Sequence, residues 1–388
     1  MIYLKLKKRS CPVCNSNQKK KILSVNRWMK MDAKGKIYIL DKKYCICGNC
    51  DLIYTNPTVS PKTFDKLYQN SVVGSYFNYE SLKSINKIKF FEKICKNYLN
   101  KKNKILEIGS GSGVLLKYLF SKYKFKKKNL TGLEPSKGIY KKLINNKFFM
   151  VKNIFLDSLN SKNKYNFIIM DNVFEHFEYP QKSLKKINQL LTNNGLIYIS
   201  IPNTKKVYGL QDDPFNHTCN YNEENIKILL NNFKFKILKL SKDSNLINIL
   251  AIKVDDLKKE KFTISNLFIK KLNLKLKKIK KEVNNIKIKA KKIKKEIHSK
   301  KDKVIVFGSG NYSLWILNML KIHPYIKCGI DNNPIYQNKI RNNILILKPS
   351  VIKKINFSKI LILSESFKRD IFKQLLKMNI PKQKIISF

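Results

Sequence analysis

Four cysteines near the start of the chain have the spacing of a metal-binding module. Cys11 and Cys14 form one Cys-x-x-Cys pair, and Cys47 and Cys50 form a second pair after 32 intervening residues. Two such turns can present four thiolates to one tetrahedral ion. Because four thiolates leave no open coordination position, the pattern predicts a structural zinc site. Cys45 could compete with Cys47, but the spacing favours Cys47 and Cys50.

A glycine-rich turn follows an apolar run that begins at Ile105. The glycines of this turn are Gly109, Gly111 and Gly113. Such a turn lets the backbone approach a ligand closely. Glu107 precedes the turn, where it could pair with a cationic amino group. The next apolar run ends in Glu134, 21 residues after Gly113, and a carboxylate there accepts both hydroxyls of a ribose. These residues predict a nucleoside-containing cofactor.

Polar side chains also follow a later apolar run, Phe167–Met170. Asp171 and Asn172 come directly after it, and Glu175 and His176 belong to the same loop. Ligands of open α/β sheets bind at the carboxyl ends of the strands, where this loop would lie. We therefore expect Asp171 and Asn172 to contact the cofactor and His176 to face the substrate.

These motifs need alternating strands and helices to bring them together. Helical periodicity covers residues 61–100 and most stretches between the later apolar runs. The runs expected to be strands are 104–108, 130–134, 166–170, 195–201 and 235–240. Alternation at this spacing predicts a mostly parallel α/β sheet covered on both faces, with the glycine-rich turn at its carboxyl edge.

Residues 256–302 have a different pattern, in which apolar residues recur at spacings of three and four and Lys fills most other positions. The apolar positions are Ile269, Leu272, Leu276, Ile279, Val283, Ile286, Ala290, Ile293 and Ile297. This heptad seam could pack on the flanking domains, form a homodimer as a coiled coil, or lie on an anionic membrane surface. Packing on the flanking domains is the favoured interpretation.

A second β-α-β pattern starts at Val304. Gly308 and Gly310 follow its first strand, and Asp331 follows its second, where it could hold a ribose. Ser313 occupies the position of a third glycine, so the pattern favours a scaffold over a second cofactor site. The expected domains are a zinc module (1–60), a cofactor-binding domain (61–255), a basic helical linker (256–302) and a C-terminal α/β domain (303–388).

The formal net charge of +54 raises the question of a nucleic-acid partner. However, only four of the 80 basic residues are Arg, and the chain has only three Ala. An A/T-rich genome imposes such a preference for Lys over Arg and such a scarcity of Ala. Proteins that recognise nucleic acids, in contrast, usually rely on Arg. A nucleic-acid partner is therefore not expected. No apolar run reaches the roughly 20 residues of a membrane span, and no signal-peptide core is present, so a cytoplasmic location is expected.

The motifs, taken in order, resemble class I S-adenosylmethionine-dependent methyltransferases. The matching features are the acidic glycine-rich first loop, the acid after the second strand, the Asp-Asn-x-x-Glu-His loop and the Gly195 to Asn203 segment. The resemblance implies a Rossmann-like fold with S-adenosylmethionine as cofactor, and Glu107 would then pair with the amino group of its methionine part. An NAD-binding domain shares the glycine-rich turn, but the Glu-His loop does not belong to it.

The chain as a whole resembles the zinc-containing sugar C-methyltransferases, which methylate a ketosugar carried on a nucleoside diphosphate. The shared order is a four-cysteine module, a methyltransferase domain, a helical segment and a small α/β domain. The segment Phe215–Tyr221 looks like that family's His-containing stretch, which implies a functional role for His217. His176 resembles a second functional His, and Tyr76 a tyrosine of the substrate site. The family's Tyr and Glu before the matching His are here Pro214 and Asn216.

Methyl transfer from a sulfonium needs an aligned nucleophile and a base that unmasks it. A neutral imidazole suits this task, whether the proton leaves a carbon next to a ketone or a hydroxyl group. We predict His217 as the base and keep His176 as the second choice, while each could instead only orient the substrate. The expected substrate is a nucleotide-linked or glycan sugar. The alternatives are a methyltransferase acting on RNA and a non-catalytic binding or assembly protein that keeps the fold.

Overall fold

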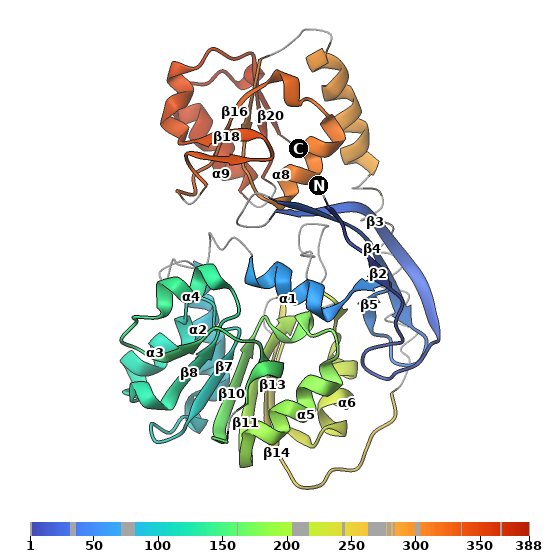
Figure 1. Cartoon of the computed structure of the whole chain (residues 1–388), viewed down its shortest axis with the longest axis vertical. Helices are drawn as coiled ribbons and strands as arrows, with labels where there is room; N and C mark the ends of the chain where they lie inside the picture. The colour runs from blue at the N-terminus through green and yellow to red at the C-terminus, as the bar shows by residue number, and fades with distance from the viewer. Residues whose placement is uncertain are drawn as a thin grey trace.

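The computed structural model describes most of the chain (Figure 1). The described residues are 2–31, 36–70, 82–160, 162–203, 217–242, 245–262, 277, 281, 284–298, 303–334, 336–364 and 367–387. Three large sheets organise these residues, and one small two-stranded sheet pairs β2 (Leu6–Lys7) with β6 (Thr58–Val59). Among the described residues, no helix has both the length and the apolar character that crossing a bilayer requires.

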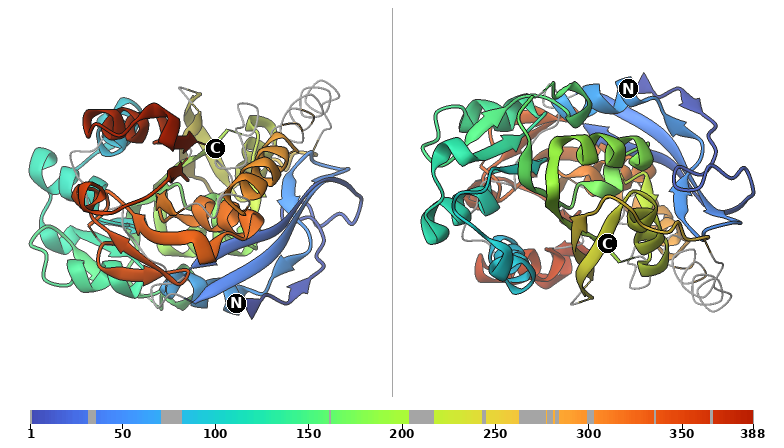
Figure 2. Two further views of the ribbon diagram at one scale, coloured as in Figure 1. Left: turned by 90° about the horizontal axis from the view of Figure 1, so that it is seen from above. Right: turned by 90° about the horizontal axis from the view of Figure 1, so that it is seen from below.

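The N-terminal sheet has five strands and carries the four cysteines at one end. Its strands are β1 (Ile2–Tyr3), β3 (Lys19–Met31), β4 (Ile37–Cys47), β5 (Ile53–Thr55) and β12 (Cys219–Asn220). The long antiparallel pair of β3 and β4 lies along one side of the molecule (Figures 1 and 2). The last strand, β12, comes from far along the chain and pairs with β5. The first 60 residues therefore share their sheet with a segment of the expected cofactor-binding domain.

The central sheet has seven strands in the order β13-β14-β11-β10-β7-β8-β9. These are β7 (Ile105–Ile108), β8 (Leu130–Leu133), β9 (Met150–Lys152), β10 (Tyr165–Asp171), β11 (Leu191–Pro202), β13 (Phe235–Ser241) and β14 (Leu246–Lys253). All neighbours are parallel except β14, which runs antiparallel to both β11 and β13. The five strands expected from the sequence are all present, and β9 and β14 are additions to them.

Helices cover both faces of the central sheet. One face packs against α2 (Leu82–Cys95), α3 (Val114–Tyr123) and α4 (Lys137–Leu143). The other face packs against α5 (Pro180–Leu190) and α6 (Glu223–Asn232), and the buried cysteines of the N-terminal module belong to the same core. The two helices next to the expected site begin at side-chain caps. Ser60 caps α1 (Pro61–Gln69), and Asn222 forms a capping box at α6.

The C-terminal sheet has six strands in the order β17-β18-β16-β15-β19-β20. They are β15 (Val304–Phe307), β16 (Ile326–Ile330), β17 (Lys339–Arg341), β18 (Ile344–Leu347), β19 (Lys359–Ile362) and β20 (Ile385–Ser387), with helices α8 (Asn311–Leu320) and α9 (Lys368–Lys377). Only β17 is antiparallel to its neighbour. This arrangement is the second, smaller α/β unit expected from the sequence.

Within the heptad segment, residues 284–298 are helical, whereas residues 256–262 form no helix or strand. Ala290, Ile293 and Ile297 of its seam are buried in one core with the N-terminal sheet, α1 and α8. This half of the seam therefore packs within the chain. The seam positions from Ile269 to Val283 lie outside the described residues.

Candidate active site and metal centre

The structure brings the four predicted zinc ligands together. The Sγ atoms of Cys11 and Cys50 are 3.6 Å apart, and those of Cys14 and Cys47 are 3.5 Å apart. All four Sγ atoms lie within 4.8 Å of one another. Four sulfurs at about 2.3 Å from a tetrahedral zinc would be separated by about 3.8 Å, so the donor set and its spacing fit the ion. The thiol of Cys45 lies apart from this group and contacts the carbonyl oxygen of Asn56 at 3.7 Å.

Arg9 joins the cysteine module to the central sheet. Its guanidinium donates hydrogen bonds to the carbonyl oxygens of Thr55 (3.0 Å), Glu178 (2.9 Å) and Thr218 (3.0 Å). Thr218 directly follows His217. The module and the strand pairing of β5 with β12 therefore hold the chain on the C-terminal side of His217.

The glycine-rich turn leaves β7 in a conformation that favours glycine. Gly109 has φ +66°, and a Cβ placed on it would lie 2.6 Å from a methyl carbon of Val173. Gly113 caps α3 with φ +73°, and a Cβ there would enter the ring of Phe149. Gly109 and Gly111 line the cavity described below, whereas Gly113 is not among its lining residues.

Glu134 lies at the end of β8 and faces the turn. Its two carboxylate oxygens accept hydrogen bonds from the backbone N–H groups of Gly111 (2.9 Å) and Ser136 (2.8 Å). Burial raises the pKa of Glu134 to about 7, against the opposing effect of these two donors. Each oxygen can still accept a further hydrogen bond, as recognition of a ribose would require.

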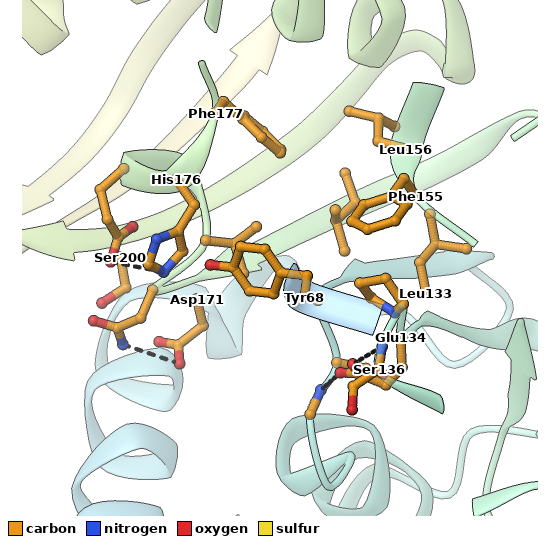
Figure 3. Close-up of a pocket in the computed structure, with 18 of the residues that line it drawn as sticks. Tyr68, Leu133, Glu134, Ser136, Phe155, Leu156, Asp171, His176, Phe177 and Ser200 are labelled. Carbon is orange, nitrogen blue, oxygen red and sulfur yellow. Dashed lines mark hydrogen bonds and ion pairs between the residues drawn. The ribbon is translucent and has the colours of Figure 1, made fainter. Parts of the chain in front are cut away.

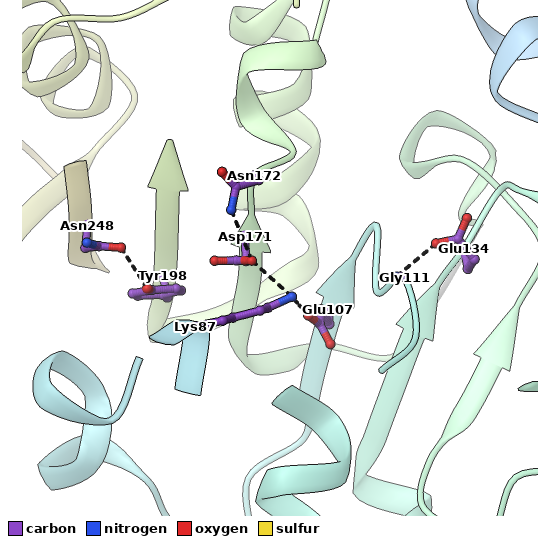
Figure 4. A network of polar contacts seen from close by, with 8 residues as sticks. All are labelled: Lys87, Glu107, Gly111, Glu134, Asp171, Asn172, Tyr198 and Asn248. Atoms are coloured by element: carbon purple, nitrogen blue, oxygen red, sulfur yellow. Dashed lines mark hydrogen bonds and ion pairs between the residues drawn. The ribbon is translucent and has the colours of Figure 1, made fainter. Parts of the chain in front are cut away.

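Lys87 is a site residue that the sequence did not single out (Figure 4). Its ammonium group lies 3.0 Å from Asp171 and 3.5 Å from Glu107. Neither Glu107 oxygen has a hydrogen-bond partner among the described residues, and burial raises the pKa of this carboxyl to about 7. Lys87 already supplies one positive charge to Glu107, and the unused lone pairs of this acid fit a further cationic ligand group. Lys87 separates the carboxyl group of Glu107 from the cavity described below, because Lys87 lines that cavity and Glu107 does not.

A cavity of about 1440 Å³ opens at the carboxyl ends of the central strands. Figure 3 shows Glu134 and Ser136 at one end of this cavity and His176 and Ser200 at the other, with Tyr68 between them. Asn172, which the sequence predicts to contact the cofactor, also lines the cavity. The volume exceeds the range of about 300–1,000 Å³ typical of single-ligand pockets. It therefore has room for a cofactor and a second molecule.

Three titratable side chains gather at the far end of the cavity. One carboxylate oxygen of Glu175 lies 3.7 Å from Nε2 of His217 and 3.9 Å from Nε2 of His176. The two imidazole ring centroids are 4.7 Å apart. Burial raises the pKa of Glu175 to about 8 and lowers the pKa of His217 well below its ordinary value, with the charge of His176 acting in the same direction. Such a cluster can accept a proton and pass it on. One possible metal-ligand atom from each of these three side chains also lies close enough to the others to share one metal ion.

Two further observations concern tyrosines at this site. Tyr76, the tyrosine expected from the family resemblance, lies outside the described residues. Tyr68 of α1 lines the cavity instead, with its ring edge-on to His176 at 5.8 Å between centroids. Only the apolar helical pattern of residues 61–100 pointed to this segment, and that pattern does not single out one tyrosine.

Two regions of the chain match known protein families. Residues 80–240 match the family described as a methyltransferase domain, and residues 300–386 match the family described as C2185-like, N-terminal. The comparison with curated proteins gives no match.

The chain is also similar to several solved structures over part of its length. A 1,6-didemethyltoxoflavin-N1-methyltransferase from Burkholderia thailandensis is 13% identical, and the match covers 55% of this chain and 96% of the other with a TM-score of 0.41. An S-adenosylmethionine-dependent methyltransferase from Clostridium acetobutylicum is 14% identical over 44% and 98% of the two chains, with a TM-score of 0.31. A protein from Pyrococcus horikoshii is 17% identical over 47% and 97%, with a TM-score of 0.38.

The family match, the Rossmann-like sheet and the acid-and-glycine geometry together define a class I methyltransferase domain. Residues 80–240 of the chain are therefore a methyltransferase domain. This match gives the class of enzyme and does not identify the substrate.

The role of Glu134 can be tested through cofactor affinity. Glu134→Ala should weaken binding of S-adenosylhomocysteine by roughly 1–3 kcal/mol, because charge-assisted hydrogen bonds to the ribose are lost. The affinity of the native protein should increase as the pH rises through about 7, where Glu134 ionises. Calorimetric titration measures both effects. Glu92→Ala is the matched control, since Glu92 pairs with Lys122 at 2.6 Å and is not a cavity residue. An unchanged affinity of the Glu134 variant would remove this residue from the cofactor site.

Proposed function

We propose that the enzyme transfers a methyl group from S-adenosylmethionine to a carbon or an oxygen of a nucleotide-linked or glycan sugar. The observation that carries this proposal is one cavity lined by the acid Glu134 at one end and by the partly buried imidazole of His176 and the buried imidazole of His217 at the other. A cofactor held at Glu134 leaves space in front of His176 and His217 for a second molecule.

Residues at the Glu134 end would hold the cofactor. Glu134 would accept the ribose hydroxyls, and Gly109 and Gly111 let the backbone approach the ligand. Lys87 and Glu107 offer opposite charges, which suits the carboxylate and amino groups of the methionine part. When bound, the cofactor supplies an electrophilic methyl group on a sulfonium. Asp171 would keep Lys87 in position, given the 3.0 Å ion pair between them.

Residues at the histidine end would prepare the nucleophile. His217 is buried and its lowered pKa keeps the imidazole neutral at neutral pH, so Nε2 can accept a proton. Glu175 lies beside both imidazoles, and ionisation of its carboxyl would balance the charge of an imidazolium. The accepted proton would come from a carbon next to a ketone or from a hydroxyl group of the sugar.

The charges of the cavity wall favour a small substrate over RNA. Among the described residues that line the cavity, the cations are Lys87 and Lys182, and the acids are Asp65, Glu134, Asp157, Asp171, Glu175 and Glu178. A groove that follows a nucleic-acid backbone needs concentrated positive charge. The excess of lysine therefore lies elsewhere on the chain.

The proposal is tested by methyl transfer from isotopically labelled S-adenosylmethionine to a panel of acceptors. The panel should contain nucleoside-diphosphate ketosugars, their hydroxyl counterparts, free sugars and a mixed RNA. Label in a sugar, located by NMR, is the expected result and distinguishes carbon from oxygen methylation. Label confined to RNA would replace the proposed substrate with the alternative one.

A further inference from the structure

The loop after β15 repeats an arrangement found at the cofactor site. Ser309 donates its backbone N–H to Oδ2 of Asp331 at 2.9 Å, as Gly111 does to Glu134 at the same distance. In both cases the other carboxylate oxygen accepts the N–H of the residue two positions later, at 2.8 Å. The same arrangement therefore occurs twice in the chain: an acid that follows the second strand of a β-α-β unit lies against the glycine-rich loop that follows the first strand.

The topology places this loop where open α/β sheets bind ligands. β15 lies between β16 and β19, so the order of the strands reverses next to it. The ten-residue helix α8 starts at Asn311, and its N-cap residue, Gly310, provides no side-chain cap. A Cβ placed on Gly310 would meet no atom within 4 Å, so the loop borders open space. The N-terminus of such a helix attracts anions.

A buried cation beside the loop gives an independent indication of a ligand. The side chain of Arg341 is only 8% exposed, and its Nε donates to the carbonyl oxygen of Ser309 at 3.2 Å. Among the described residues, its two terminal nitrogens have no hydrogen-bond acceptor and no ion-pair partner. The guanidinium stacks on the ring of Tyr336 at 4.2 Å from the centroid, which leaves the fork of nitrogens available for an oxyanion.

We propose that this loop is a second ligand site, which binds the ribose and phosphate of a nucleotide. Asp331 would accept a ribose hydroxyl, and Arg341 with the start of α8 would bind the phosphate oxygens. Asp331 is an opposite charge near the buried guanidinium of Arg341, and a phosphate would supply oxygen acceptors for the two terminal nitrogens, which have none among the described residues. The inference concerns only the C-terminal sheet and does not depend on the substrate proposed for the methyltransferase cavity.

The test is a calorimetric titration of the full chain, with S-adenosylhomocysteine first added to saturation. ADP, UDP, their 2′-deoxy forms and inorganic pyrophosphate are the probes. The ribonucleotides should bind more tightly than pyrophosphate, because pyrophosphate lacks a group for Asp331. Arg341→Gln should weaken nucleotide binding by about 10- to 100-fold, because hydrogen bonds to a charged group typically contribute this much to affinity. Asp331→Asn should reduce the preference for ribose over deoxyribose.

Matched controls separate this site from surface charge and from the methyltransferase cavity. Arg369→Gln and Asp370→Asn change exposed residues of α9 and should leave nucleotide binding unchanged. Glu134→Ala should also leave it unchanged, because that acid belongs to the other cavity. The proposal is overturned if no nucleotide binds to the native chain. It is also overturned if Arg341→Gln binds nucleotides as tightly as the native chain, or if Asp331→Asn keeps the native preference for ribose over deoxyribose. Thermal melting confirms that each variant is folded.

Discussion

Cys47→Ser is expected to abolish stoichiometric zinc binding and to destabilise the chain strongly. The native protein should hold about one zinc per chain at Cys11, Cys14, Cys47 and Cys50. Metal binding is part of the folding free energy in such modules and is worth on the order of 10 kcal/mol in isolated zinc fingers. Elemental analysis and thermal melting measure the two effects. Cys45→Ser is the matched control, because this buried thiol lies outside the group of four.

The same variant should lose methyl transfer as well as stability. Arg9 and the pairing of β5 with β12 connect the cysteine module to the residues that follow His217. Loss of the metal should therefore disturb the histidine end of the cavity. Full zinc content and an unchanged melting temperature in Cys47→Ser would contradict the zinc assignment.

His217→Asn is expected to lower kcat by about 10²–10⁴-fold, the usual contribution of a positioned base. Affinity for S-adenosylhomocysteine should change little, because the residue is assigned to the substrate end of the cavity. The activity of the native enzyme should increase with pH as His217 loses its proton. Burial lowers the pKa of this group, so the acidic limb should lie below about pH 6.5. That limb should disappear in the variant.

Two comparisons identify the residue that acts as the base. If His176→Asn is inactive while His217→Asn keeps most activity, the assignment of His217 as the base is wrong, and His176 is the base. If both variants are active and Glu175→Gln is not, the carboxylate is the base. Treatment with a chelator addresses the metal alternative, since loss of activity without loss of structural zinc would indicate an ion bound by Glu175, His176 and His217.

Periodicity and motif spacing predicted much of the fold and part of the site. The alternation of apolar runs predicted five strands of the central sheet, because buried parallel strands are nearly continuous apolar segments. The Cys-x-x-Cys spacing predicted the four-thiol group. Local patterns of this kind are fixed by neighbours in the sequence, which is why they can be recognised without a structure.

Features that depend on distant contacts could not be predicted in this way. Lys87 is one lysine among many, and only the fold places it between Glu107 and Asp171. The pairing of β12 with β5 joins residues more than 160 positions apart. The glycine pattern at Gly308 favoured a scaffold, and the burial of Arg341 beside that loop is visible only in three dimensions.

The central claim is that the cavity at Glu134 binds the sulfonium cofactor of a methyltransferase. Its most direct test is calorimetric titration of the full chain with S-adenosylmethionine, and separately with NAD. We expect S-adenosylmethionine to bind in the micromolar range, roughly −8 kcal/mol, and Glu134→Ala to weaken that binding. Binding of NAD in this cavity in preference to S-adenosylmethionine would contradict the account.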